Sequence, residues 1–256
     1  MKISVVMQSY LGDYPGARTN PEMKFIRAVY SMIGQSNPNW ELIIAADGCK
    51  ITERLYKEHF QHYSNIKFFM VEKPEDTTMN NKDRKYFRGK PRAVAVKNAT
   101  GNWISYLDAD DIYINTAIDK IIKLIKIVKD NRKDAKCVLN NAIIENEKEL
   151  VFWNKLDTEK MKHINKPVGK VHSIPGLDGK WVGMSFYIKG TKKLSIPLGT
   201  YCLIHKNGWP TWEWGDSVAE NLGEDNAFIK PMLKEGKHVV ISLPLYVRCH
   251  GKRWDL

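Results

Sequence analysis

The sequence predicts an α/β fold built on a mainly parallel sheet, and three observations lead to this prediction. Strand-like and helix-like segments alternate along the first hundred residues, as in parallel sheets covered by helices on both faces. The strand-like segments are short apolar runs rich in β-branched residues. Polar residues (Ser9, Asp47 and Asp108) come just past three of these runs. Because ligands in such sheets bind beyond the carboxyl ends of the strands, we expect these three positions to converge on one crevice.

The elements are predicted in chain order from these patterns. Strands are expected over residues 3–7, 41–46, 66–71 and 102–107, and helices over residues 22–33, 52–63 and 115–129. The last helix is the most amphipathic, with one apolar face and one basic face: Ile118, Ile121, Ile122, Ile125 and Val128 against Lys120, Lys123, Lys126 and Lys129. A core helix with a solvated basic face is favoured over a membrane-surface helix. From about residue 173, periodicity fades and Gly, Pro and Trp increase, which predicts loops and short strands appended to the sheet.

Composition limits the class of protein. With 256 residues, 43% hydrophobic and 27% charged, the chain has the composition of an ordinary globular protein. It has no apolar run of 18 residues, and its N-terminus lacks the layout of a signal peptide, so no transmembrane segment is expected. The four cysteines are scattered, which fits reduced thiols and a cytoplasmic location, the host cytoplasm if the protein is viral. The net charge of +11 favours a polyanionic partner, although solubility alone also explains it.

The segment from Trp103 to Asp111 is the most informative in the chain. A short apolar run ends in three carboxylates, Asp108, Asp110 and Asp111. Three like charges this close are stabilised by a hard divalent cation, because Mg²⁺ and Mn²⁺ prefer carboxylate oxygens. An Asp-rich turn that caps the following helix is the alternative.

Five segments, taken in order, resemble the family 2 glycosyltransferases with the GT-A fold. They are residues 3–10 (the opening strand), 27–36 (a first helix with its Ser and Gln), 40–49 (the strand ending in Asp-Gly), 92–111 (Arg92 through Leu-Asp-Ala-Asp-Asp) and 223–225 (Gly-Glu-Asp). The resemblance covers residues 1–115 well and 200–250 loosely. It implies a Rossmann-like sheet flanked by helices, with a C-terminal acceptor-side region of loops and short strands.

The resemblance also implies an activity and a division of the chain. Residues 1–115 would form the nucleotide-sugar-binding half, and residues 116–256 a helix plus the acceptor-binding half of the same domain. The implied activity is inverting, metal-dependent transfer of a sugar from a nucleotide-diphosphate donor, a UDP-sugar being favoured, to a hydroxyl of a glycan or lipid-linked acceptor. Modified DNA, carrying a hydroxymethylated or already glycosylated base, is the alternative acceptor. A nucleotide- or sugar-binding protein without catalysis is the alternative class. The oligomeric state stays open.

The donor side of the implied site uses the strand ends. Asp110 would ligate Mn²⁺ or Mg²⁺ together with His250, and Asp108 would hold the ribose or reach the metal through water. Asp47 would accept a hydrogen bond from the nucleotide base. Arg92 would contact phosphate or orient Asp108, with a structural salt bridge as the alternative.

Two further groups complete the nucleotide side. Backbone groups of Gln8, Ser9 and Tyr10 would frame the base and ribose. The densest basic stretch, residues 82–92, is expected to be a loop beside the diphosphate, either a phosphate clamp or a solvated loop.

The acceptor side depends on the second half of the chain. Asp225 is the candidate general base, a role that typically contributes about 10²–10⁴-fold. Glu224 would position the acceptor or Asp225, and Trp212 and Trp214 would stack on a sugar or base. An acidic helix start at residues 224–225 and loop-core anchors at the tryptophans are the structural alternatives.

Three departures from the family pattern concern the donor site. Ala46 replaces the first Asp of the Asp-Asp-Gly motif, so Asp47 alone must read the base. Gln8 stands where Pro is usual, and Ala93 where Asn is usual. Residues 11–24 look like an insertion, which we expect to form a loop near the donor end.

Overall fold

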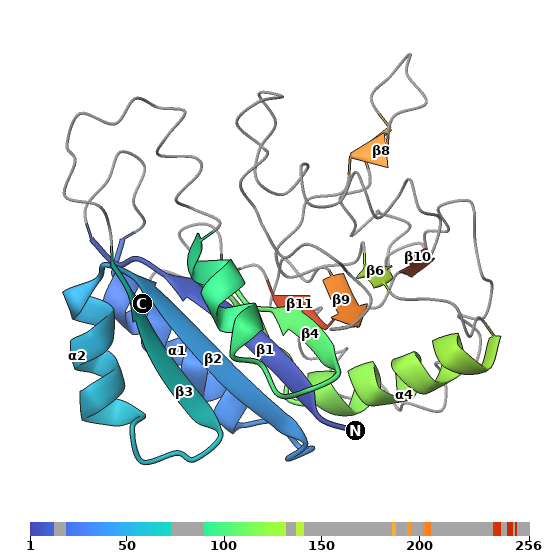
Figure 1. Ribbon diagram of the computed structural model, residues 1–256, viewed down its shortest axis with the longest axis horizontal. Coiled ribbons are helices and arrows are strands. Elements are labelled where there is room, and N and C mark those ends of the chain that lie inside the picture. The colour runs from blue at the N-terminus through green and yellow to red at the C-terminus, as the bar shows by residue number, and fades with distance from the viewer. Residues whose placement is uncertain are drawn as a thin grey trace.

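A seven-stranded sheet forms the centre of the computed structural model (Figure 1). The structure describes residues 1–12, 19–72, 90–131, 137–140, 186–187, 194–195, 202–205, 238–241, 245–247 and 249. The strand order in the sheet is β10-β6-β9-β4-β1-β2-β3. The strands are β1 (Ile3–Ser9), β2 (Trp40–Asp47), β3 (Ile66–Val71), β4 (Trp103–Tyr106), β6 (Cys137–Asn140), β9 (Cys202–His205) and β10 (His238–Ile241).

The sheet is mainly parallel, as predicted. β1 pairs in parallel with β2 and β4, and β2 pairs in parallel with β3. β9 runs antiparallel to both β4 and β6, and β10 is parallel to β6. Strands from both predicted halves of the chain therefore share one sheet.

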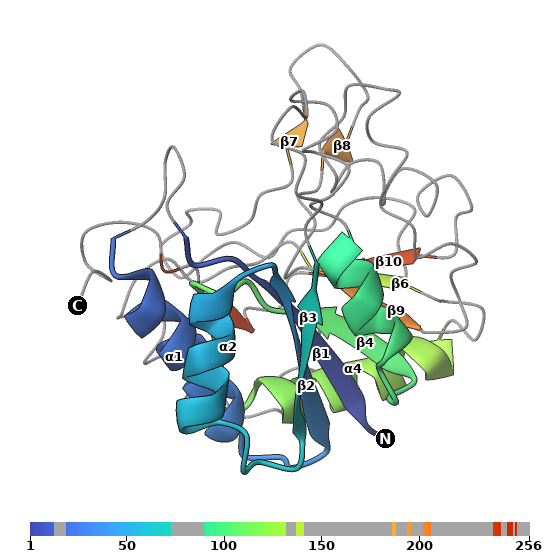
Figure 2. The ribbon, with the colours of Figure 1, turned by 60° about the vertical axis from the view of Figure 1, so that its left-hand side comes forward.

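Helices cover the two faces of the parallel part (Figure 2). Buried residues of α1 (Pro21–Ile33), α2 (Lys50–His59) and α4 (Ala117–Asn131) share one apolar cluster with Ile3, Val5 and Met7 of β1. A helix over residues 90–97 lies on the opposite face, where Val6, Ile43 and Ile104 are also buried. Because both faces are covered, the strands are continuous apolar runs.

The predicted strands and helices agree with the observed ones to within a few residues. The β3 bounds are those predicted, and β1, β2 and β4 differ by one or two residues at an end. The α2 helix ends at His59 instead of residue 63, where the chain turns toward β3. The expectation of a loop up to residue 92 was wrong at its end, because residues 90–97 are helical. Helix α4 differs at Lys120, which was placed on the solvated face but is fully buried, and burial lowers its pKa to about 8.

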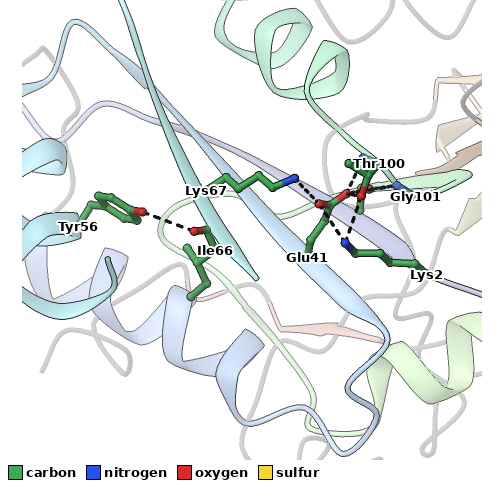
Figure 3. Close-up of polar contacts among 8 residues, drawn as sticks. Lys2, Glu41, Tyr56, Ile66, Lys67, Thr100 and Gly101 are labelled. Atoms are coloured by element: carbon green, nitrogen blue, oxygen red, sulfur yellow. Dashed lines mark hydrogen bonds and ion pairs between the residues drawn. The ribbon is translucent and has the colours of Figure 1, made fainter. Parts of the chain in front are cut away.

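A buried carboxylate ties the amino-terminal edge of the sheet together (Figure 3). Glu41, at the start of β2, is fully buried and accepts hydrogen bonds from Ser4 Oγ at 2.5 Å and from the backbone N–H of Thr100 at 2.6 Å. The Nζ atoms of Lys67 and Lys2 lie 2.9 and 3.3 Å from Glu41 Oε2. Burial alone raises the pKa of Glu41, but the hydrogen bonds from Ser4, Lys67 and Thr100 outweigh it and hold the pKa well below its usual range.

The turn that enters β4 belongs to the same cluster. The Gly101 N–H donates to Ser4 Oγ at 2.8 Å. A Cβ at Gly101 would lie 2.7 Å from the backbone oxygen of Lys2, so a side chain does not fit there. β4 is therefore fixed against β1 at its start, and this fixes where its carboxyl end, with Asp108, comes to lie.

Small antiparallel ladders complete the described part. β5 (Ile112–Tyr113) pairs with β11 (Tyr246–Val247), and β7 (Phe186–Tyr187) pairs with β8 (Leu194–Ser195). Among the residues that the structure describes, no helix is both long enough and apolar enough to cross a membrane.

Candidate active site at the carboxyl edge of the sheet

Three central strands end side by side at the carboxyl edge of the sheet. β1 lies between β4 and β2, with Gln8 opposite Ala45 of β2 and Val6 opposite Tyr106 of β4. The next residues beyond these pairs include Asp47 on β2 and Asp108 after β4. The structure therefore brings the ends of these strands, with Ser9, Asp47 and Asp108, to one edge, as the sequence predicted.

Asp108 is held by an arginine on the helix 90–97. The Nη2 atom of Arg92 lies 3.5 Å from Asp108 Oδ1, and the side chains of Arg92 and Asp108 are 11% and 44% exposed. The guanidinium is thus mostly buried while the carboxylate stays accessible. This ion pair fits both the predicted role of Arg92 in orienting Asp108 and the alternative of a structural salt bridge.

Asp110 and Asp111 occupy different environments. Asp111 is buried, and its Oδ1 accepts a 2.7 Å hydrogen bond from the backbone N–H of Cys249. Asp110 is partly exposed, and its backbone oxygen accepts a hydrogen bond from Arg27 Nη2 at 3.2 Å. Asp111 therefore supports the loop, while the side chain of Asp110 remains the better candidate for a ligand.

The bond from Asp111 to Cys249 is one of several that join the C-terminal segment to the acidic loop. β11 pairs with β5, which follows Asp111 directly, and the N–H of Ile114 donates to the Leu245 oxygen at 3.0 Å. Residues 245–247 thus lie against the segment that follows the three carboxylates, and Cys249 is bonded to the last of the three. Cys249, which directly precedes His250 in the chain, is thus bonded to the acidic loop.

The Cys249 thiol is not a candidate nucleophile. Its pKa is raised to about 12, mainly by burial. The negative charges of Asp111 and Asp110 also raise this pKa, and the positive charges of Arg27 and Lys24 lower it. A thiol with such a pKa stays protonated at neutral pH. Arg27 and Lys24, both on α1, therefore lie near the Cys249 thiol.

Ser31 of α1 and Gln35, two residues beyond the end of this helix, support the loop, and both belong to the motif in residues 27–36. The Tyr113 N–H donates to Ser31 Oγ at 3.2 Å. The Gln35 amide donates to the Ile114 oxygen at 2.8 Å and accepts from the Ile118 N–H at 3.0 Å. These two side chains fix residues 113–118, so their part in the motif is to hold the loop and the start of α4.

The remaining residues of the predicted nucleotide site differ in exposure. Asp47 is largely buried at the end of β2 and is followed by Gly48, whose φ of 61° lies in the left-handed region that glycine adopts readily. The Ser9 hydroxyl is buried and bonds to Thr52 Oγ1 at 2.9 Å, so it is used within the fold. Tyr10, the residue after β1, is 38% exposed.

The donor set at the acidic loop suits a hard divalent cation. Within the described part of the chain no three His, Cys, Asp or Glu side chains are grouped as a metal site. Mg²⁺, however, is usually bound by one or two carboxylates together with substrate phosphates. The partly exposed residues Asp108 and Asp110 fit that mode, whereas the buried and hydrogen-bonded Asp111 does not.

The other predicted site residues lie outside the described residues: His250, Trp212, Trp214, Glu224 and Asp225, together with residues 82–89 of the basic stretch. Their assignments stay predictions.

Arg27 is a residue of the site that the sequence analysis did not single out. It reaches the Asp110 backbone from α1, across 83 positions of the chain. Its position at the start of the motif in residues 27–36 was the available signal, but helical spacing alone does not show that its side chain turns toward the sheet edge.

Comparison with known proteins agrees with this architecture. The sequence model described as Glycosyl transferase family 2 matches residues 20–169, more than half of the chain. Comparison with curated protein sequences gives no match.

Solved structures of S. aureus TarS are similar in fold. TarS 1–349 in complex with UDP has 16% identity and a TM-score of 0.55, over 97% of this chain and 60% of that one. TarS 1–349 in complex with UDP-GlcNAc has 16% identity and a TM-score of 0.52, over 99% and 60%. This chain thus spans about three fifths of the length of TarS 1–349, and 36% of the longer TarS structure.

Proposed function

The chain belongs to glycosyl transferase family 2, and we propose that it transfers a sugar from a UDP-sugar to a hydroxyl of a glycan or lipid-linked acceptor, with inversion and with a divalent metal. The observation that carries this proposal is the arrangement at the carboxyl edge of the sheet. Asp47 lies at the end of β2, and the partly exposed residues Asp108 and Asp110 follow β4. This is where a nucleotide binds in a sheet of this type.

The proposed donor site assigns one part of the nucleotide to each strand end. Asp47 accepts a hydrogen bond from the base, and Asp108, held by Arg92, binds the ribose or a metal-bound water. Asp110 ligates the metal, together with His250. The bound cation would neutralise charge that develops on the departing diphosphate. The TarS complexes with UDP and UDP-GlcNAc support uridine as the base.

The proposed chemistry needs one further group on the acceptor side. Asp225 takes the proton of the acceptor hydroxyl as that oxygen forms a bond to the anomeric carbon, and the bond from that carbon to the diphosphate oxygen breaks. Glu224 positions the acceptor, and Trp212 and Trp214 provide a surface on which a ring stacks. These assignments rest on the family resemblance of residues 223–225 and on the composition of the preceding segment.

Modified DNA is the second candidate acceptor, and the net charge of +11 is the observation that favours it. Under this alternative the donor chemistry is unchanged.

The experiment that tests the proposal is a transfer assay with Mn²⁺ and a panel of nucleotide-sugars. The acceptors are lipid-linked sugars, free glycans and DNA carrying hydroxymethylated or glucosylated bases, and products are identified by mass. Addition of one sugar to a glycan or lipid acceptor supports the proposal, and addition to a nucleoside moves the acceptor to DNA. The proposal would be overturned if the protein showed no sugar transfer to any acceptor and no metal-dependent hydrolysis of any UDP-sugar.

The Asp225→Asn variant separates the catalytic base from donor binding. We expect transfer to fall by about 10²–10⁴-fold, while UDP binding stays close to that of the parent protein. An equal loss of UDP binding would contradict the role as base.

A further inference from the structure

Gln8 lies in the middle of the carboxyl edge of the sheet. It is on β1, which lies between β4 and β2, and it pairs with Ala45. Side chains alternate between the two faces of a strand. Since Val5 and Met7 belong to the cluster shared with α1, α2 and α4, Gln8 faces the side of the helix 90–97.

The neighbours of Gln8 on that face are the residues assigned to the nucleotide. Leu42, Ile44 and Ala46 of β2 belong to the opposite cluster, so Asp47 is on the Gln8 face. Arg92 of the helix 90–97 pairs with Asp108, which puts this carboxylate on the same side. Gln8 therefore lies between Asp47 and Asp108 on one face of the sheet edge.

The Gln8 amide is unusual among the polar groups of the described residues. Its Oε1 atom is buried, yet it accepts no hydrogen bond from any residue that the structure describes. The residue as a whole is only partly buried. A buried carbonyl oxygen without a donor is costly, and in a folded protein such a group calls for an explanation.

A structural role does not explain this amide. Gln35 shows how this chain uses a glutamine to hold the fold, with its amide paired to the oxygens of Ser31 and Ile114 and to the N–H of Ile118. The Gln8 Oε1 atom has no such partner among the described residues. The related family usually has proline at this position, which has no side-chain polar group, so a contact made by the amide would be particular to this chain.

We propose that the side-chain amide of Gln8 is a specificity-determining group that binds the nucleoside of the donor between Asp47 and Asp108; this inference rests on the proposed function. The Oε1 atom needs a hydrogen-bond donor, and a uridine nucleotide offers two kinds: the imide N–H of the base and the ribose hydroxyls. A carboxylate can only accept hydrogen bonds, whereas an amide both donates and accepts. The Gln8 amide can therefore donate a hydrogen bond to a carbonyl of the nucleotide and accept one from an N–H or O–H, whereas the two flanking carboxylates can only accept.

The test compares Gln8→Met with the control Gln35→Met in the full-length chain. Methionine keeps the length and most of the volume of glutamine but removes the amide. Binding of UDP, 2′-deoxy-UDP and N3-methyl-UDP is measured by calorimetry with Mn²⁺, and the melting temperature of each variant is recorded.

We expect Gln8→Met to weaken UDP binding by about tenfold with little change in melting temperature, because a hydrogen bond to the ligand is lost while the fold is not affected. Gln35→Met should lower the melting temperature, because it removes hydrogen bonds made within the fold. In the parent protein, the analogue that lacks the group bound by Gln8 should bind more weakly than UDP, and in Gln8→Met it should bind as well as UDP does. If this analogue is 2′-deoxy-UDP, the partner of Gln8 is the ribose; if it is N3-methyl-UDP, the partner is the base.

Unchanged UDP affinity in Gln8→Met would overturn the inference while leaving the proposed function intact. A drop in melting temperature as large as that of Gln35→Met, with unchanged affinity once folded, would overturn it in favour of a structural role. If the parent protein does not bind UDP with Mn²⁺, the proposed function and this inference both fail.

Discussion

The two edges of the parallel sheet use carboxylates in opposite ways. At the amino edge, Glu41 is fully buried and is surrounded by two hydroxyls, backbone N–H groups and two lysines. At the carboxyl edge, Asp108 is 44% exposed beside one mostly buried arginine. Glu41 lies within β2, whereas Asp108 lies in the loop that follows β4, so the buried carboxylate is part of a strand and the exposed one lies beyond a strand.

This difference separates stability from function along each strand. A carboxylate whose lone pairs are all used by the protein holds neighbouring segments together and has little capacity left for a ligand. A carboxylate that is 44% exposed beside a mostly buried arginine is oriented yet still able to bind. Changes at the carboxyl edge should therefore affect ligands, and changes at the amino edge should affect the fold.

The largest expected effect is that of Asp110→Ala on the ligand side of this comparison. Metal-dependent donor binding and transfer should fall by about 100-fold or more, since charge stabilisation by a metal is worth several kcal/mol. The melting temperature should hardly move. Titration of UDP with and without Mn²⁺ measures the effect, and Asp119→Ala on α4 is the matched control. Binding that is unchanged and still depends on metal would remove Asp110 from the metal site.

On the fold side, Glu41→Gln should lower the free energy of unfolding by about 2–4 kcal/mol, because a buried, fully bonded carboxylate is replaced by an amide that repels some of the same donors. Chemical denaturation measures this change. The control Glu58→Gln removes a carboxylate that is 47% exposed and pairs with Arg54, and should cost less than about 1 kcal/mol. If transfer per folded molecule drops in Glu41→Gln, the separation of the two edges is wrong.

The pH dependence of stability sharpens the same contrast. The folded pKa of Glu41 lies below its ordinary value of 4.5, so the stability that its charge contributes is complete above about pH 4.5 and is lost as the pH falls further. Denaturant titrations between about pH 5 and pH 3 should show a steep loss in the parent protein and a shallower one in Glu41→Gln. Parallel curves would show that Glu41 is not the main acid-labile group.

The smallest effect is expected for Ser9→Ala. Although Ser9 lies at the carboxyl edge, its hydroxyl is bonded to Thr52 at 2.9 Å, so the change should cost about 1 kcal/mol of stability. Donor affinity should stay within about twofold, since only a backbone contact is proposed there. Calorimetry with UDP and a melting curve suffice, and a tenfold loss of affinity would mean that the hydroxyl itself contacts the nucleotide.

The sequence predicted the parallel sheet because its strands, such as residues 66–71, are apolar runs that end at polar residues. It also predicted that Asp47 and Asp108 lie at one edge, which follows from parallel topology alone. It did not predict that Arg27 reaches the Asp110 backbone or that Lys120 is buried, because periodicity gives the face of a helix but not the tertiary partner of a long side chain.

Short strands were the other features that pattern could not show. β5 and β11 have two residues each, too few for any periodicity, and they pair because distant segments meet. The different environments of Asp110 and Asp111 follow from this pairing, since it brings the Cys249 N–H to Asp111, whose carboxylate accepts its hydrogen bond.

The hydrogen bond between Asp111 and Cys249 joins residues 138 positions apart. On a ribosome, β1 to β4 and their helices emerge long before residue 249, and they can pair while the rest of the chain is still being made. Contacts of such large sequence separation form late and slowly. A chain that has not yet reached residue 249 therefore lacks the hydrogen bond that holds Asp111, even where β1 to β4 have already paired.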